Sequence, residues 1–500
     1  MMAGDMASST LPWLTLAIFI PVLTGLLVLA IGRDEYPQPA RVVALAGSVL
    51  GLLVTLPLYT GFDAATAEMQ FVEKVSWIET FSVNYHLGID GISLWFVLLT
   101  AFITVIVVLA GWESITRKVA QYMAAFLILS GLMIGVFVAL DGMLFYIFFE
   151  ATLIPMYLII GIWGGPRRVY ASIKFFLYTF LGSLLTLIAF IYLWSAANGS
   201  FDILTWHELP LAHTPQLFIF IALFAAFAVK VPMWPVHTWL PDAHVEAPTG
   251  GSVVLAAIML KLGAYGFLRF SLPIAPDASH ELAGFMIALS LIAIIYIGLV
   301  AIVQDDMKKL VAYSSVAHMG FVTLGFFVFN SAGLEGGIVQ MISHGFVSGA
   351  MFLCIGVLYD RLHTREIDAY GGVVNVMPRF VTLFLLFSMA NTGLPATSGF
   401  VGEFSVIMGA VQHNFWVGLA AASSLIWAAA YSLWMFKRIA LGDIGNDRVR
   451  AMPDLSGREF FILGVMAIMV LFMGIYPAMF TDVMHVSVDA LLQHVSVSKL

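Results

Sequence analysis

Residues 230–266 read KVPMWPVHTWLPDAHVEAPTGGSVVLAAIMLKLGAYG. At the start of this stretch Lys230, Pro232 and Pro235 interrupt an apolar run that begins at Gln216. A proline has no backbone N–H and its ring clashes with the preceding turn, so the carbonyl four residues before each proline loses its usual partner. We therefore expect a transmembrane helix to break here, with a charged side chain beside free backbone groups.

The composition places the whole chain in lipid. Of its 500 residues 61% are hydrophobic and 10% are charged, and the mean hydropathy is +0.98, which excludes a soluble globular protein. A helix needs about twenty apolar residues to cross a bilayer, so we expect an all-α integral membrane protein with about fourteen transmembrane helices. No basic region precedes the first run, so we expect that run to be a retained span and not a cleaved signal. The expected spans are 11–31, 41–62, 89–112, 119–140, 142–163, 170–196, 214–240, 248–270, 281–303, 308–330, 333–359, 376–412, 414–436 and 460–481.

Basic residues sort to one side of these spans. One side receives only Lys74, Arg269 and Lys499. Because lysine and arginine gather in cytoplasmic loops, we expect the crowded side to face the cytoplasm, or the matrix of an organelle, and both termini to lie opposite. The crowded side receives Arg33, Arg41, Arg117, Lys118, Arg167, Arg168, Lys308, Lys309, Arg361, Arg365, Arg379, Lys437, Arg438, Arg448, Arg450 and Arg458.

Several ionisable residues remain inside the expected spans. Lys261 lies ten residues after Gly251 and eight before Arg269, roughly 12 to 15 Å of helix on either side, so it belongs near the midplane. Lys174 is only one turn into its helix and can extend its amine to the interface. A charge at the bilayer centre costs at least a few kcal/mol, so the set either works in transport or forms static pairs that lock helices together. The other members are Glu150, Lys230, His318, His344 and Glu403.

A second break resembles the first. The segment NTGLPATSGFVGEF, residues 391–404, combines Pro395 with Glu403. Counted from the fourth and from the ninth span, each break falls in the fourth helix of a five-helix set. An odd number of spans gives the two sets opposite orientations, which is the inverted-repeat design of secondary transporters. We therefore expect an N-terminal three-helix segment, a first half, an inverted second half, and a cytoplasmic loop with a C-terminal helix, at 1–118, 119–270, 281–436 and 437–500.

The sequence offers no set of residues for a redox centre. Its one cysteine, Cys354, lies inside an apolar span, which excludes an intrachain disulfide and a cysteine-ligated cluster within this chain. No glycine-rich dinucleotide fingerprint stands between a strand and a helix. We expect no metal site and no cofactor site in this chain.

Long motifs resemble one family of membrane proteins. Residues 230–266 are similar to the antiporter-like membrane subunits of NADH:quinone oxidoreductase (complex I), a family shared with multi-subunit cation/proton antiporters. Glu403, as the acid of the second broken helix, resembles one branch of the complex I subunits, whereas sister chains and antiporter homologues usually have lysine there. The resemblance extends over most of the chain through FFEATLIPMYLIIGIWG around Glu150, YSSVAHMGF around His318, SHGFVSGAMFL around His344 and GLPATSGFVGEF around Glu403.

The resemblance implies proton translocation driven by electron transfer in other subunits. It implies that Glu150 and Lys230 form the charge pair of one half-channel and that Lys261 is a central relay. His318, His344 and Glu403 would continue the path to the opposite face. It places NAD, FMN, iron–sulfur clusters and quinone in partner subunits, and it implies contacts with other complex I membrane subunits, including sister antiporter-like chains L and N. The expected surroundings are a bacterial inner membrane, or else a mitochondrial one, with no nucleic acid.

Three further polar residues, His237, Asp242 and His244, lie near the cytoplasmic end of the first broken helix. They could take up protons, or they could cap the break. Two alternatives to a complex I subunit stay open at this stage. One is a subunit of a sodium/proton antiporter, against which Glu403 argues, and the other is a passive scaffold, which titration of the buried charges would identify.

Overall fold

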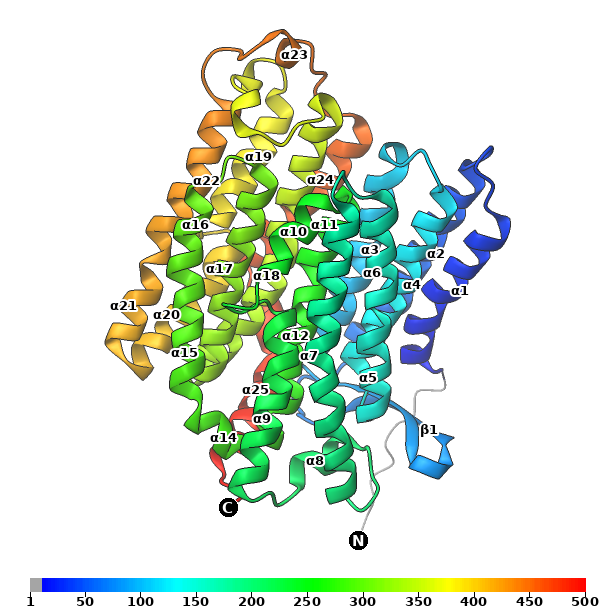
Figure 1. Ribbon diagram of the computed structural model, residues 1–500, viewed down its shortest axis with the longest axis vertical. Helices are drawn as coiled ribbons and strands as arrows, with labels where there is room; N and C mark the ends of the chain where they lie inside the picture. Colours follow the sequence, from blue (N-terminus) through cyan, green and yellow to red (C-terminus); the bar gives the residue numbers. More distant parts are fainter. Residues whose placement is uncertain (1–10) are drawn as a thin grey trace.

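The apolar runs fold into long helices that lie side by side (Figure 1). The computed structural model describes residues 11–500, so the expected position of the N-terminus itself falls outside the described residues. Among those residues thirteen helices are long and apolar enough to cross a membrane. The expected class, a helical integral membrane protein, is confirmed. The remaining expected span, 376–412, corresponds to two shorter helices with a break between them.

The N-terminal segment contains a feature that the sequence reading missed. Between its second and third helices an antiparallel hairpin forms, with Glu73 opposite Leu87 and Val75 opposite Tyr85. The chain is therefore not purely α-helical, because it also contains this two-stranded sheet. Glu73 accepts hydrogen bonds from the first backbone N–H groups of the first helix and so ties the hairpin to the bundle. The elements are α1 (Trp13–Ile31), α2 (Gln38–Thr60), β1 (Gln70–Ile78), η1 (Glu79–Phe81), β2 (Val83–Ile89) and α3 (Leu94–Ser114).

The first half contains the first broken helix. The second span of this half begins where Asp141 caps the N–H groups of Met143 and Leu144, and it is divided at Thr152 into two helices. Its last span contains two π-helical turns, which widen the helix locally and often occur at functional sites. The elements are α4 (Val119–Val138), α5 (Gly142–Ala151), α6 (Leu153–Trp163), α7 (Arg168–Ala196), α8 (Ile203–Glu208), α9 (His213–Lys230), α10 (Trp239–Glu246), α11 (Thr249–Val254), the π-helix η2 (Leu255–Met259), α12 (Leu260–Gly266), the π-helix η3 (Phe267–Ser271) and α13 (Leu272–Ile274).

The second half contains the second broken helix and the longest helix of the bundle, Ser331–Leu362. Asp306 and Asn330 cap the two helices that precede the break. The elements are α14 (Pro276–Glu281), α15 (Ala283–Ile292), the π-helix η4 (Ala293–Ile297), α16 (Gly298–Ile302), α17 (Met307–Phe327), α18 (Ser331–Leu362), η5 (Ile367–Ala369), η6 (Val373–Asn375), α19 (Pro378–Asn391), α20 (Ser398–His413), α21 (Phe415–Ala422) and α22 (Ser424–Ala440).

The chain ends with α23 (Asp447–Arg450), α24 (Gly457–Ile475) and α25 (Ala478–Ser496). The sequence predicted a single C-terminal helix, with a span over 460–481. In the structure α24 ends at Ile475, and α25 is a separate helix whose Ser487 accepts a hydrogen bond from the N–H of Gly91. A helix with charged and polar residues on one face does not register as an apolar run, which explains why it was missed.

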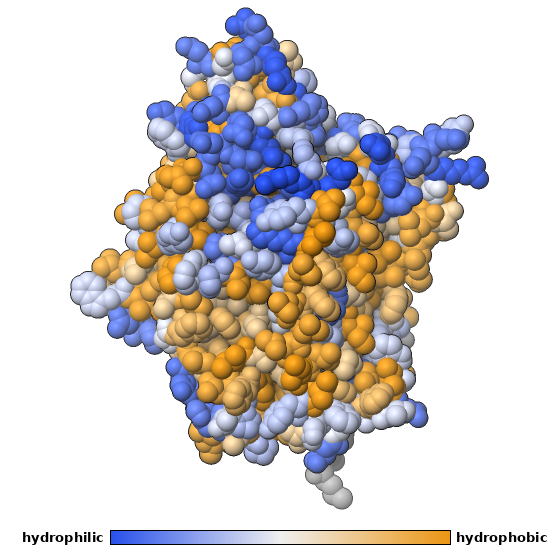
Figure 2. Space-filling model, viewed as in Figure 1, coloured by the Kyte–Doolittle hydropathy of each residue, from blue (hydrophilic) through white to orange (hydrophobic). Residues whose placement is uncertain are grey.

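Burial separates the inner helices from the outer ones. The apolar windows of Thr249–Ile274 and Ser331–Leu362 are 100% buried, and that of Met307–Phe327 is 94% buried, whereas Trp13–Ile31 is 33% buried. On the face drawn in Figure 2 apolar residues cover much of the middle of the molecule, and polar residues gather at the end where α23 lies. The start of α1, the hairpin, α8 and the end of α25 lie at the opposite end (Figure 1). The inner helices are the ones that carry Lys261, His318 and His344.

Candidate functional site: a buried row of ionisable residues

The first helix break forms at the expected place. α9 ends at Lys230 and α10 begins at Trp239. The carbonyl of Ala228, which Pro232 deprives of its partner, accepts a hydrogen bond from the N–H of Met233 at 2.7 Å. The indole N–H of Trp239 donates to the carbonyl of Val229 at 2.8 Å. Pro232 and Pro235 therefore act as predicted, and substitute donors satisfy part of the broken turn.

The second break lies between α19, which ends at Asn391, and α20, which begins at Ser398. Pro395 stands inside it as predicted, and Gly393 next to it adopts a φ of +78°. A side chain is disfavoured at that φ, so the glycine permits the turn. The two breaks therefore occur in the helices that the sequence identified.

Lys261 lies at the centre of the bundle and is fully buried. It follows η2 directly, and its side chain folds back along the helix so that Nζ donates to the carbonyl of Ala256. Side chains on a helix lean toward its N-terminus, which favours this direction. The same Nζ lies 2.6 Å from Nδ1 of His344. An ammonium group can only donate, so Nδ1 accepts when Lys261 is charged and His344 then carries its proton on Nε2.

Lys261 and His344 begin a row of buried ionisable residues, which continues through His318. The rings of His344 and His318 have centroids 5.8 Å apart, and Nδ1 of His318 lies 2.5 Å from Oε1 of Glu403. Nε2 of His318 lies 3.1 Å from Oδ1 of Asn391, whose amide N–H donates to Ser432. Both ring nitrogens thus face oxygen acceptors, an arrangement that fits the doubly protonated imidazolium.

Glu403 ends this row on α20. Its Oε1 also accepts a hydrogen bond from Gln340 at 3.1 Å, while Oε2 has no hydrogen-bond partner among the described residues. Glu403 also lines a cavity of about 10 Å³, together with Ser424 and Trp427. The structure therefore brings Lys261, His344, His318 and Glu403 together, with His344 and not His318 next to Lys261.

Glu150 and Lys230 are less directly connected. Both lie in the first half and their charges interact, but among residues 11–500 they make no ion pair. Nζ of Lys230 lies 4.5 Å from the centre of the Phe149 ring, and neither Nζ nor Oε1 of Glu150 has a hydrogen-bond partner in the described chain. Their role as a charge pair stays a prediction.

The three residues near the first break are not a connected group. Asp242 pairs with Lys174 at 2.7 Å, so each of these charges has a partner. His237 is buried and its Nδ1 is unpartnered among the described residues. His244 is fully buried, and neither ring nitrogen has a partner in the part of the chain that the structure describes.

Two basic residues that the sequence placed at the surface are buried. Arg269 pairs with Asp90 at 2.7 Å, and both are buried. Lys308 is 7% exposed and donates to the carbonyl of Ala247 at 2.6 Å. Their partners come from segments far away in the chain, which no local pattern indicates. Within residues 11–500 no group of three or more His, Cys, Asp or Glu side chains is arranged to hold a metal ion.

Comparison with known proteins shows the family. Residues 139–427 match the family described as "NADH:quinone oxidoreductase/Mrp antiporter, TM". The chain is 51% identical over 497 residues to "NADH-quinone oxidoreductase subunit M" of Rhodobacter capsulatus, covering 96% of each chain. It is 49% identical over 478 residues to "NADH-ubiquinone oxidoreductase chain 4" of Arabidopsis thaliana, covering 95% of this chain and 96% of the relative.

Solved structures agree with this assignment. A chain of "Respiratory complex I from Thermus thermophilus with bound NADH" is similar with a TM-score of 0.89 and 30% identity, covering 96% of this chain and 99% of that one. A chain of the Mrp complex from Dietzia sp. has a TM-score of 0.80 at 22% identity, over 97% of this chain and 51% of that one, and shares the fold. The chain therefore belongs to the family of antiporter-like membrane subunits of NADH:quinone oxidoreductase, among the members named subunit M or chain 4.

Proposed function

We propose that this chain is the subunit M of an NADH:quinone oxidoreductase and translocates protons across a bacterial inner membrane. Electron transfer takes place in partner subunits, which hold NAD, FMN, iron–sulfur clusters and quinone. Sister antiporter-like chains L and N are its neighbours in the membrane. Residues 119–270 and 281–436 act as two inverted half-channels that meet at Lys261.

One observation carries the proposal. Four ionisable groups on four different helices, Lys261, His344, His318 and Glu403, follow one another through short contacts inside the most buried part of the bundle. Ionisable residues in the membrane face a protein interior and mark ion or proton pathways. In a set of static ion pairs every polar atom of each charged group would have a hydrogen-bond partner. Here His344 Nε2 and Glu403 Oε2 have no such partner among residues 11–500.

The hydrogen bonds from Lys261 to His344 and from His318 to Glu403, with the two imidazole rings 5.8 Å apart, support the following proton path. The Lys261 ammonium gives its proton to Nδ1 of His344, which can release the proton on Nε2 toward His318. His318 gives a proton to Oε1 of Glu403, and the carboxylic acid releases it from Oε2 into the small cavity. Each transfer moves one proton and returns the donor to its neutral or anionic form. In a low-dielectric interior the charge of each group acts strongly on the next, so a charge change at Glu150 and Lys230 can bias Lys261.

The test replaces Glu403 with glutamine, which has nearly the same shape but cannot carry the proton. Membranes with Glu403→Gln are assayed for assembled complex, NADH-driven quinone reduction and proton uptake into inverted vesicles. We expect normal assembly and a fall of about tenfold or more in both rates. Glu281→Gln is the matched control, since Glu281 is exposed and pairs only with His213 among the described residues. Wild-type rates in an assembled Glu403→Gln complex would refute the proposed path.

A further inference from the structure

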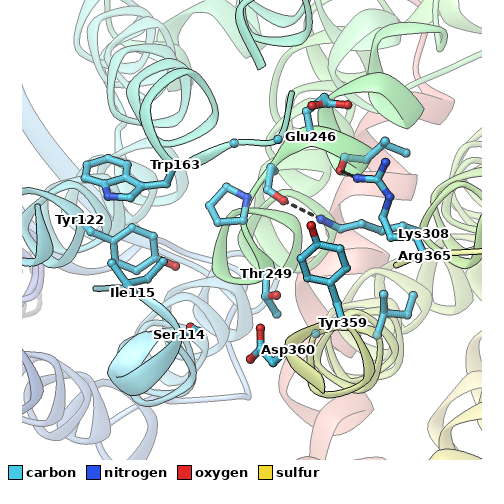
Figure 3. A pocket seen from close by; sticks show the side chains of 17 residues that line it. Ser114, Ile115, Tyr122, Trp163, Glu246, Thr249, Lys308, Tyr359, Asp360 and Arg365 are labelled. Atoms are coloured by element: carbon cyan, nitrogen blue, oxygen red, sulfur yellow. Dashed lines mark hydrogen bonds between the residues drawn. The ribbon is translucent and has the colours of Figure 1, made fainter. Parts of the chain in front are cut away.

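A cavity of about 200 Å³ opens at the arginine-rich end of the molecule, between the two halves of the chain (Figure 3). Its wall combines residues of α3, α4, the α10–α11 junction, α17 and α18, among them Tyr122, Thr249, Lys308, Tyr359 and Asp360. Tyr359 is 38% exposed, so the cavity has an outer rim in contact with the surroundings. Its volume is enough for several water molecules.

Lys308 is the one buried amine in the wall of this cavity. Its side chain reaches across to the carbonyl of Ala247 (Figure 3), and among the described residues it has no carboxylate in ion-pair contact. Arg365, beside it, pairs with Asp306 and donates to the carbonyl of Val245, while Glu246 accepts the N–H of Arg167. The carboxylates of Asp306 and Glu246 therefore bond to other groups, and Lys308 lines the cavity together with Asp360. A buried ammonium without a paired carboxylate is costly, which argues against a purely structural ion.

His244 lies on the inner side of Lys308. It belongs to α10, three residues before the carbonyl that Lys308 contacts, and its ring stacks on Phe352 with centroids 4.4 Å apart. Its charge would interact with both Lys308 and Lys261. Both ring nitrogens are buried and free of partners within residues 11–500. A neutral imidazole with one open acceptor and one open donor can accept a proton on one nitrogen and release one from the other.

We infer that Lys308 takes up protons from this cavity and passes them through His244 to the Lys261–His344 pair, an uptake route between the two halves. The inference rests on the proposed function and adds Lys308 as the residue that delivers protons to Lys261 and His344. The Lys308 ammonium gives a proton to one nitrogen of His244, which becomes an imidazolium and releases the proton on its other nitrogen toward Lys261. The neutral Lys308 amine then regains a proton from water in the cavity. After one proton has passed, Lys308 and His244 have returned to their starting protonation states.

The first test separates proton exchange from positive charge. Arginine keeps the charge and can donate to Ala247, but it does not release its proton in a protein. We expect Lys308→Arg and Lys308→Met membranes to assemble the complex and to lose about tenfold or more in quinone reduction and proton uptake. Lys309→Arg, on the next residue of the same helix, is the control and keeps wild-type rates. Wild-type rates in assembled Lys308→Arg would overturn the inference.

The second test works on complex that is already assembled, and it decides the matter if Lys308→Arg does not assemble. Thr249→Cys lines the cavity, and the native Cys354, which is fully buried, is replaced by alanine. Inverted vesicles are treated with a bulky, charged methanethiosulfonate reagent, and each rate is compared with its own value before treatment. We expect a large loss for Thr249→Cys and none for Thr116→Cys, which is exposed at the same end outside this cavity.

Equal rates before and after complete modification of Thr249→Cys would overturn the uptake route. The parent chain with Cys354→Ala and no added cysteine reports any effect of the reagent on partner subunits. These failures remain distinct from failure of the proposed function, because Glu403→Gln tests the row itself. Loss in Glu403→Gln together with wild-type Lys308→Arg would keep the row and place its uptake elsewhere.

Discussion

Glu150 and Lys230 are a pair of ionisable residues of the first half that the described structure leaves without a direct contact. The amine of Lys230 lies over the Phe149 ring, and its charge interacts with that of Glu150 without a hydrogen bond between them. We propose that these two charges can come together and separate, as a switch requires. That proposal gives a prediction for the side chain of Glu150.

We expect Glu150→Gln to assemble and to lose about tenfold or more in proton uptake, because it removes the negative charge that faces Lys230. Glu150→Asp keeps the charge on a shorter arm and should retain partial activity, and Lys230→Ala should be at least as damaging as Glu150→Gln. Quinone reduction should fall together with proton uptake, because the two share one free-energy cycle. The scaffold alternative predicts instead that any loss follows the amount of assembled complex. Full assembly with wild-type rates in Glu150→Gln would remove Glu150 from the mechanism.

Gly263 decides how closely the broken helix approaches the central one. A Cβ there would lie 2.8 Å from Cβ of Lys230 and 2.8 Å from the carbonyl oxygen of Phe227. The backbone oxygen cannot move without shifting the turn that ends at Lys230. We therefore expect Gly263→Ala to cost about 1 to 3 kcal/mol of stability and to lower the rate per assembled complex.

The matched control for that change is Gly464→Ala, because nothing lies within 4 Å of a Cβ added at Gly464. Both glycines are in membrane-spanning helices, so the gain in helix propensity is similar. The measurements are assembled complex on native gels, its thermal inactivation, and quinone reductase rate per complex. Gly263→Ala behaving like Gly464→Ala in all three would show that the close approach has no role.

At the scale of elements, the sequence predicted the parts that depend on local chemistry. Pro232, Pro235 and Pro395 specify both helix breaks, since a missing N–H acts on its own turn. The sequence did not predict the β1–β2 hairpin, because that element forms through pairing between two strands and through the contact of Glu73 with α1. It missed the burial of Lys308 for the same reason, since the carbonyl that accepts its hydrogen bond lies 61 residues away in the chain.

A charged cluster is one of the contacts that hold the hairpin to the first half, besides the hydrogen bonds from Asn84 to Asp141 and from Leu140 to His86. Asp202 pairs with Lys74 of β1 at 3.0 Å, and His86 of β2 lies 3.4 Å from the same oxygen. Burial opposes ionisation of Asp202, but the contacts with His86 and Lys74 outweigh it and hold the pKa of this carboxyl well below its usual range. Because the folded pKa is depressed, the stabilisation is complete above the unfolded value of about 3.9 and is lost as the pH falls through the folded pKa.

We expect Asp202→Asn to loosen the hairpin at neutral pH while leaving α8 intact, because asparagine also caps helices well. Lys74 is half exposed, so solvent screens the pair and the change should be about 1 kcal/mol. Hydrogen exchange of the β1 amides should become about fivefold faster at pH 7. The difference from wild type should shrink in strong acid, where both carry a neutral side chain. An unchanged exchange rate at pH 7 would show that Asp202 does not hold the hairpin.

At the scale of the whole molecule, apolar residues lie on the outer spans and ionisable residues lie in the buried ones, which is the reverse of a soluble protein. Trp13–Ile31, a span with few polar groups, is mostly unburied within this chain, whereas the fully buried spans carry Lys261 and His344. Hydropathy therefore found the spans but could not rank them by depth. The three most buried spans, Thr249–Ile274, Met307–Phe327 and Ser331–Leu362, each carry an ionisable residue, which lipid cannot solvate and a protein interior can.

The basic residues also predict how the bundle is oriented. Arg448 and Arg450 lie in α23, at the end where polar residues gather in Figure 2, while the hairpin and the end of α25 lie at the other end (Figure 1). By the positive-inside rule the α23 end faces the cytoplasm. A protease-sensitive tag after Leu500 should therefore be cut in right-side-out vesicles and protected in inverted ones.

A second tag in the loop around Arg448 should show the reverse pattern. Lys499 donates to the carbonyl of Ile274 and its backbone N–H contacts Asp277, so the tag follows a segment fixed to the bundle and reports its side of the membrane. Quinone reduction in the tagged membranes checks that the complex is intact. If the Leu500 tag is cut in inverted vesicles of active complex, the orientation is reversed, and the cavity at Lys308 then opens on the face that releases protons.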